Sequence, residues 1–281
     1  VATNQQIREL LGDDERLANT LEADETKNTE EALVEVYKKL RPSEPVTIEA
    51  AQQQIAVWAR VAAGVADAKN VRCLMFGMNM NNVAVTDGDR VEFEQRMGYH
   101  VDYYPVSSLM DYFKKVTDAE ADALVEEYKQ LYTIKIDESG EEVYWEKVKN
   151  AAKAEIALRR VLKDEGATAF TTNFDDLGGA DINDPNFLGF DQIPGLASQR
   201  LMAEGYGFGA EGDWKVAAMT AIMKAMGKDS NGASAFMEDY TYHLEQGNEY
   251  SLGAHMLEVC PSLAEADKKP RIETHHLGIG M

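Results

Sequence analysis

The sequence has few cysteines, no long apolar run and no basic leader. Its two cysteines, Cys73 and Cys260, each lie in a short apolar run, which favours buried, reduced thiols over a disulfide scaffold. No stretch approaches the roughly 18 apolar residues of a membrane-spanning helix. The first ten residues lack the basic and apolar regions of a signal peptide. We therefore expect a cytoplasmic protein without a membrane segment.

Basic residues are also scarce relative to acidic ones. The chain has 28 Lys and Arg against 49 Asp and Glu, a formal net charge of −21. Such a surface repels phosphate backbones, and we find no local basic patch to offset the repulsion. Nucleic-acid binding is therefore not expected. With 281 residues, the chain is long enough for two domains with cores of their own.

Three regions follow one another along the chain. Residues 1–68 predict a helical N-terminal segment, with helices over 29–40 and from Thr47 to about Ala68. Residues 69–230 alternate continuous apolar runs with amphipathic helices, which is typical of an α/β domain with a parallel, Rossmann-like sheet. Residues 231–281 are rich in Tyr, Phe and Thr and predict the start of a C-terminal β domain. Strands are expected at 71–77, 99–105 and 167–173, the first and last of them buried, and helices at 107–116, 118–132, 143–165 and 195–205.

A glycine motif, "GFGAEG" at 207–212, matches the G-x-G-x-x-G fingerprint of dinucleotide-binding proteins. That fingerprint requires a strand before the loop, and here we expect a helix ending near Gly205. We therefore expect no nicotinamide or flavin. The loop instead presents Glu211 just before Asp213, the expected N-cap of a helix that begins with Trp214. Glu211 is then either a second capping carboxylate or a carboxylate held in the positive field of the helix end.

A second carboxylate and a histidine occur further along the chain. Glu238 and His255 lie at the outer ends of two strand-like runs that flank "EQGNE", and a hairpin would bring them together. His255 has apolar neighbours, and a lone histidine in an apolar strand is more often a satisfied core residue than a ligand. Two carboxylates and an imidazole suit Mn²⁺, Mg²⁺ or Zn²⁺, and the oxygen ligands favour the first two. Spacing alone leaves open an ordinary hairpin with its polar residues in water.

The other histidines are assigned no chemical role. His100 and His243 are expected to be structural or exposed. His275 and His276 are adjacent and are expected on one strand, where neighbouring side chains point to opposite faces, so at most one would join a site.

Six blocks of the sequence resemble, in order, blocks of the L-arabinose isomerase family. The resemblance runs from roughly residue 55 to the end of the chain. The blocks are "FGMNMNNVAVTDGD", "AFTTNFDDL", "PGLASQRLMAEGYGFGAEGDWK", "FMEDYTYH", "LGAHMLEVCP" and "HLGIG".

The resemblance implies a metal-dependent enzyme that interconverts L-arabinose and L-ribulose, and often D-galactose and D-tagatose. It implies that Glu211 and Glu238 both bind a divalent metal, usually Mn²⁺, and act as acid and base through an ene-diol. His255 would be a further metal ligand. The residues implied to line the sugar pocket are Met80, Phe174 and Phe236. The complete protein would be a homo-oligomer.

The chain also departs from the family pattern. Met78 stands where an acidic residue is expected, and a further histidine-containing block and an N-terminal domain are not found. We therefore expect a central piece of a longer protein, with little isomerase activity on its own. The alternative is a non-catalytic, isomerase-like protein that acts in assembly or regulation. Uptake of Mn²⁺ distinguishes the two.

Overall fold

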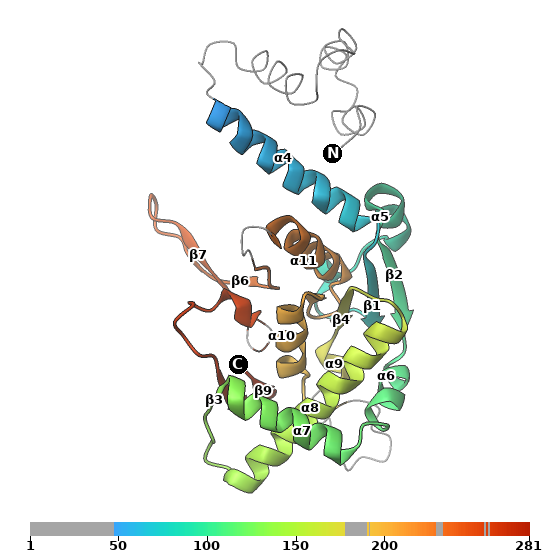
Figure 1. Cartoon of the computed structure of the whole chain (residues 1–281), viewed down its shortest axis with the longest axis vertical. Coiled ribbons are helices and arrows are strands. Elements are labelled where there is room, and N and C mark those ends of the chain that lie inside the picture. The colour runs from blue at the N-terminus through green and yellow to red at the C-terminus, as the bar shows by residue number, and fades with distance from the viewer. Residues whose placement is uncertain (1–47, 178–189, 191, 229–232, 256, 258) are drawn as a thin grey trace. The chain divides into compact units, whose positions relative to one another are not determined.

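The computed structural model describes residues 48–177, 190, 192–228, 233–255, 257 and 259–281. The chain divides into two compact units, Val1–Gly64 and Val65–Met281. The boundary falls inside the first labelled helix, α4 (Ile48–Ala68) in Figure 1. The helix expected at 29–40 lies outside the described residues. All further elements belong to the second unit.

A four-stranded parallel sheet forms the centre of this unit. Its strands are β1 (Arg72–Phe76), β2 (His100–Tyr104), β4 (Ala169–Thr172) and β5 (Gly207–Gly209). They lie in the order β2-β1-β4-β5, so the predicted parallel α/β sheet is confirmed. The order reverses direction between β1 and β4, as in doubly wound folds of the flavodoxin type. Such folds bind ligands outside the carboxyl ends of the strands at this point.

Helices connect the strands and lie close to their predicted positions. The four-residue α9 has no counterpart in the sequence-based prediction, and neither does the eight-residue α5. It is capped by Asp89, whose side chain accepts from the Glu92 N–H, and none of its residues is buried, so no apolar period marks it. The helices of this unit are α5 (Arg90–Met97), α6 (Val106–Phe113), α7 (Asp118–Leu131), α8 (Glu141–Asp164), α9 (Phe174–Leu177), α10 (Gly195–Glu204) and α11 (Trp214–Gly227).

Both faces of the sheet are buried. Leu74 and Phe76 of β1 join one core with α6 and α8, while Cys73 and Met75 join a second core that includes Trp214 of α11. Side chains of a strand alternate between faces, so one continuous apolar run supplies both cores. Figure 1 shows α8 and α11 on either side of the sheet.

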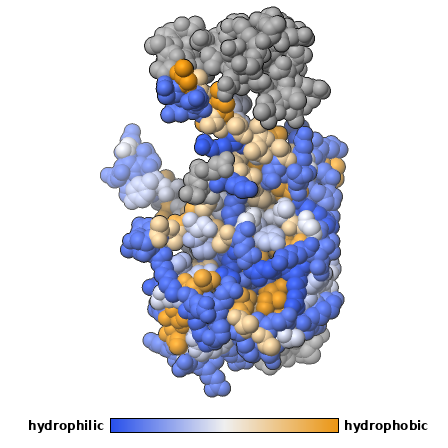
Figure 2. Space-filling model, viewed as in Figure 1, coloured by the Kyte–Doolittle hydropathy of each residue, from blue (hydrophilic) through white to orange (hydrophobic). Residues whose placement is uncertain are grey.

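The face of the molecule drawn in Figure 2 is largely polar. Figure 2 shows hydrophilic residues over most of the coloured face, with apolar residues in separate patches. In the part of the chain that the structure describes, no helix has both the length and the apolarity needed to cross a membrane.

The strand β5 corrects one expectation. A strand does enter the glycine loop, so the absence of a strand is not a reason to exclude a dinucleotide. The structure explains the glycines in another way: a Cβ on Gly207 would lie 2.2 Å from the Ala217 carbonyl oxygen, and one on Gly209 would lie 2.3 Å from that of Asp213. Both glycines therefore allow β5 to pack directly on α11.

The C-terminal strands form two further sheets. β6 (Glu238–His243) and β7 (Tyr250–Ala254) are the predicted antiparallel hairpin. β8 (Arg271–His275) pairs with β9 (Gly278–Gly280) and with the short β3 (Thr133–Ile134), which precedes α8. His275 is the last residue of its strand, so the expectation of opposite faces is wrong: the rings of His275 and His276 lie 4.0 Å apart.

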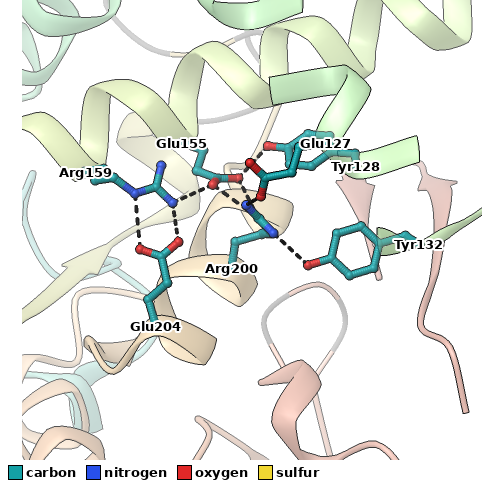
Figure 3. Close-up of polar contacts among 7 residues, drawn as sticks. All are labelled: Glu127, Tyr128, Tyr132, Glu155, Arg159, Arg200 and Glu204. Carbon is teal, nitrogen blue, oxygen red and sulfur yellow. Dashed lines mark hydrogen bonds and ion pairs between the residues drawn. The ribbon is translucent and has the colours of Figure 1, made fainter. Parts of the chain in front are cut away.

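A buried ionic network joins α7, α8 and α10 (Figure 3). Glu155 of α8 is fully buried and accepts from Tyr128 at 2.5 Å, from Arg159 at 2.6 Å and from Arg200 at 3.2 Å. Arg200 comes from α10 and also donates to Tyr132 and Glu127. The network fixes α10 against the long helix α8, and α10 in turn supports the segment that follows β7.

Candidate metal centre

Glu211 lies in the tight turn between β5 and α11. Its φ is +62°, and among the described residues no other non-glycine residue has a positive φ. This left-handed conformation costs an L-residue about 1–2 kcal/mol, and such strain is found most often at functional positions. The turn therefore holds a carboxylate at the carboxyl end of the sheet at an energetic cost.

The cap of α11 is supplied by Asp213, as predicted. Its side chain accepts from the Val216 N–H at 3.0 Å. Burial raises the pKa of Asp213, and the hydrogen bond from Val216 opposes that shift. The capping bond is thus made by Asp213, so the position of Glu211 needs another explanation.

The hairpin places Glu238 beside His255. Glu238 is the first residue of β6 and pairs with Ala254, the last residue of β7, which directly precedes His255. The register of one antiparallel pair therefore joins two residues that are 17 positions apart in the sequence. The side chain of Glu238 is half-buried and that of His255 is buried, with 9% of its surface exposed.

The three side chains meet. One ligand atom from each of Glu211, Glu238 and His255 lies within 4.8 Å of the others. Three ligands of one ion, with bonds of about 2.1 Å, lie roughly 3–3.6 Å from one another, so side-chain movements of about 1 Å allow all three to bind one ion. Two carboxylates and one imidazole suit a divalent cation such as Mn²⁺. The donor set therefore fits a metal.

The residues implied to line a sugar pocket surround these groups. The ring of Phe236 meets that of His255 edge-on, with centroids 4.7 Å apart, and the Phe174 ring lies 6.2 Å away. The backbone N–H of Met80 donates to the Glu211 carbonyl at 3.2 Å. All six residues singled out from the sequence therefore lie in one region, although no contact with a sugar is observed.

Sequence reasoning missed two asparagines that lie in the loops after β1 and β4. Asn79, in the loop after β1, donates through Nδ2 to the Gly212 carbonyl at 2.9 Å and to Thr86 Oγ1 at 3.0 Å. Asn173, after β4, donates to the Met78 carbonyl. The side chain of Met78 itself is 59% exposed. A polar residue at the carboxyl end of a parallel strand was the available signal.

The segment after His255 is held from the other side by α10. Leu257 is buried against two glycines: a Cβ on Gly195 would lie 2.6 Å from its Cβ, and one on Gly280 would lie 2.8 Å from its Cδ2. Gln199 of α10 donates to the carbonyls of Val259 and Met281 and accepts from the Met281 N–H. The helix fixed by the Glu155 network thus anchors the chain next to His255.

Comparison with known proteins agrees with the sequence blocks. A family profile described as the L-arabinose isomerase central domain matches residues 72–229, and one described as the L-arabinose isomerase C-terminal domain matches residues 233–281. The L-arabinose isomerase of Phocaeicola vulgatus is 55% identical over 232 residues, which cover 82% of this chain and 44% of the relative.

Other relatives give the same result. The L-arabinose isomerase of Bacteroides thetaiotaomicron is 55% identical over 230 residues (81% of this chain, 44% of the relative). That of Tolumonas auensis is 47% identical over 230 residues (82% of this chain, 44% of the relative). The chain thus spans less than half the length of the curated relatives it matches.

Proposed function

Because the chain belongs to the L-arabinose isomerase family, we propose that it carries the metal and acid–base centre of an enzyme that converts L-arabinose to L-ribulose. The observation that carries this proposal is the convergence of Glu211, Glu238 and His255 within 4.8 Å. These residues come from two separate parts of the chain, a strained turn and the base of a hairpin. Such an arrangement is costly to maintain without a function.

We propose that the bound ion is Mn²⁺, held by the two carboxylates and by His255. A divalent cation in this position would polarise the carbonyl and hydroxyl oxygens of the sugar. The protein oxygens outnumber the single nitrogen, which favours Mn²⁺ or Mg²⁺ over softer ions. Three protein donors leave coordination positions for oxygens of the sugar or of water.

The carboxylates are suited to the proton transfers of the reaction. Converting an aldose to a ketose moves one proton from C2 to C1 and another from O2 to O1, with no net oxidation. We propose that one of Glu211 and Glu238 removes the C2 proton and returns it to C1, through an ene-diol of the sugar. The other exchanges protons with the sugar oxygens. Both side chains are half-buried, which keeps them reachable by a small substrate while limiting water.

The apolar residues would shape the sugar pocket. Phe236 packs on His255 and would hold its imidazole ring in place. Phe174 and Met80 would cover the carbon atoms of the sugar that react. D-galactose has one more exocyclic carbon than L-arabinose, and we propose that it is a second substrate. By likeness to the family we also propose a cytoplasmic enzyme that assembles from identical subunits.

Metal binding is the first test. The chain and three variants, Glu211→Gln, Glu238→Gln and His255→Ala, are stripped with a chelator and titrated with Mn²⁺, with free ion followed by electron paramagnetic resonance. We expect one Mn²⁺ per wild-type chain and affinities at least about tenfold weaker in each variant. Ketose formation from L-arabinose, with D-galactose alongside, is measured on the same samples.

Two results would count against the proposal. Equal Mn²⁺ affinity in the wild type and all three variants would place the ion elsewhere. A chain that takes up no Mn²⁺ would favour the non-catalytic, isomerase-like protein considered above. Thermal unfolding of each variant serves as the control, because loss of the fold would also abolish binding.

A further inference from the structure

We propose that Asn79 is a positioning residue that holds Glu211 in the conformation in which it presents its carboxylate. The inference rests on the proposed function, since it assigns Asn79 a role in that metal centre. Asn79 itself lies in the loop after β1, at the point where the strand order of the sheet reverses.

The backbone that follows Glu211 is held at three successive polar groups. The Glu211 carbonyl accepts from the Met80 N–H at 3.2 Å, and the Gly212 N–H donates to the Thr172 carbonyl at 3.0 Å. The Gly212 carbonyl then accepts from Asn79 Nδ2 at 2.9 Å, and also from the Trp214 N–H of the same turn at 2.9 Å. Of the three partners that lie outside the turn, two thus come from the adjacent residues 79 and 80. Of these two, only Asn79 acts through its side chain, so only its contribution can be removed by substitution.

The amide of Asn79 is itself oriented. Its second N–H donates to Thr86 Oγ1 at 3.0 Å, and the hydroxyl of Thr86 donates in turn to the Val83 carbonyl at 2.8 Å. Thr86 is 2% exposed. Reversing the amide would set its oxygen against the Gly212 carbonyl, two acceptors without a proton between them. The network therefore fixes a donor facing the turn, which an aspartate could not supply.

The turn also fits closely against this residue. Gly212 has a φ of +81°, and a Cβ there would lie 2.7 Å from the Cα of Asn79. Glu211 and Gly212 are thus two consecutive left-handed residues lying directly on the loop after β1. The cost of that conformation at Glu211 is comparable to the net value of one hydrogen bond. Without the bond from Asn79, the turn can relax and carry the carboxylate away from Glu238 and His255.

The test compares Asn79→Ala and Asn79→Asp with the wild type in Mn²⁺ titrations. We expect both to weaken Mn²⁺ binding about 10- to 100-fold, the range found for groups that orient metal ligands. Thr86→Val should also weaken Mn²⁺ binding, but less strongly, because it removes the group that orients the Asn79 amide and leaves the amide itself in place. The matched control is Asn70→Ala, since Asn70 also donates to one backbone carbonyl, that of Ala66, but at an exposed position. It should leave the affinity unchanged.

A double-mutant cycle separates positioning from a general loss of stability. If Asn79 acts through Glu211, then Asn79→Ala should change the Mn²⁺ affinity of the Glu211→Gln variant by less than about twofold. An equal loss in both backgrounds would overturn the inference, as would wild-type affinity in Asn79→Ala. Should Asn79→Ala fail to fold, Thr86→Val decides: a weakened affinity supports the role and an unchanged one overturns it.

The two proposals fail in different ways. If the substitutions at Glu211, Glu238 and His255 leave Mn²⁺ binding unchanged, the proposed function falls and the role of Asn79 falls with it. If those three substitutions weaken binding and Asn79→Ala does not, only the role of Asn79 is overturned.

Discussion

The buried carboxylate of Glu155 is expected to contribute strongly to the stability of the fold. It is fully buried between Arg159 and Arg200, which are themselves mostly buried, and it is the point where three helices are joined. Removing one partner from a buried ionic group leaves the other charges desolvated, which commonly costs about 3–5 kcal/mol. We expect Glu155→Gln to lower the free energy of unfolding by about that amount, measured in urea.

The matched control for this change is Glu204→Gln. Glu204 also pairs with Arg159, but its side chain is 41% exposed, and exposed pairs contribute about 0–1 kcal/mol. A similar loss of stability in both variants would show that burial of Glu155 is not what matters. A small loss in both would show that the network contributes little to the stability of the fold.

At the scale of elements, the contact between β5 and α11 depends on the absence of side chains. A Cβ at Gly207 would lie 2.2 Å from the Ala217 carbonyl oxygen and 2.8 Å from the Ala221 nitrogen, so the helix must move to admit it. We expect Gly207→Ala to destabilise the protein by about 1–3 kcal/mol, the usual cost of overpacking. Thermal or urea unfolding measures the change.

A glycine in an open strand gives the comparison. At Gly253 of β7, a Cβ would meet the flexible end of Met237 at 3.3 Å and the Glu238 carbonyl oxygen at 3.9 Å, which is an ordinary van der Waals distance. We expect Gly253→Ala to change the free energy of unfolding by no more than about 0.5 kcal/mol. If Gly207→Ala were equally mild, the close approach of β5 and α11 would not be a real constraint.

The elements divide clearly into those that sequence can predict and those that it cannot. Apolar runs predicted β1 and β4, because a strand covered on both faces needs apolar side chains throughout. The edge strand β2 was also predicted, although only one of its residues is buried. The strand β5 was missed because glycines carry no such signal. The helix α5 was missed because it has no fully buried residue, and only Phe93 packs against the core. Apolar patterns in a sequence indicate which side chains are buried, so they do not predict elements that bury few or no apolar side chains.

The candidate site was predictable in part for a similar reason. The glycine turn and the hairpin indicated where Glu211, Glu238 and His255 lie along the chain. Their approach to within 4.8 Å depends on strand order and on the pairing of Glu238 with Ala254, which residue spacing does not specify. Asn79 was missed because no local pattern shows which carbonyl, 133 residues further along, its amide will reach.

At the scale of the whole molecule, stability is expected to be uneven. The core strands β1 and β4 are buried on both faces, whereas the hairpin exposes large side chains along its length. An isolated two-stranded hairpin is marginally stable in water. Those exposed side chains are Tyr240, Tyr242, Leu244, Tyr250 and Leu252.

Amide hydrogen exchange measures this difference. We expect amides near the hairpin turn to exchange at close to the unprotected rate, and those of β1 and β4 to exchange only through global unfolding. Slow exchange throughout the hairpin would contradict this expectation for the single chain. It would show that another surface covers the hairpin, and dilution of the sample would reveal whether that surface is a second copy.

The left-handed backbone of Glu211 has a consequence for anyone who selects this protein for heat tolerance. Glycine adopts a φ of +62° without the penalty that glutamate bears, so Glu211→Gly is among the easiest gains in stability at this turn. A screen that scores melting temperature alone would therefore tend to enrich the substitution that deletes a proposed metal ligand. Directed evolution of this chain needs selection for bound metal or turnover in every round, or it will trade function for robustness.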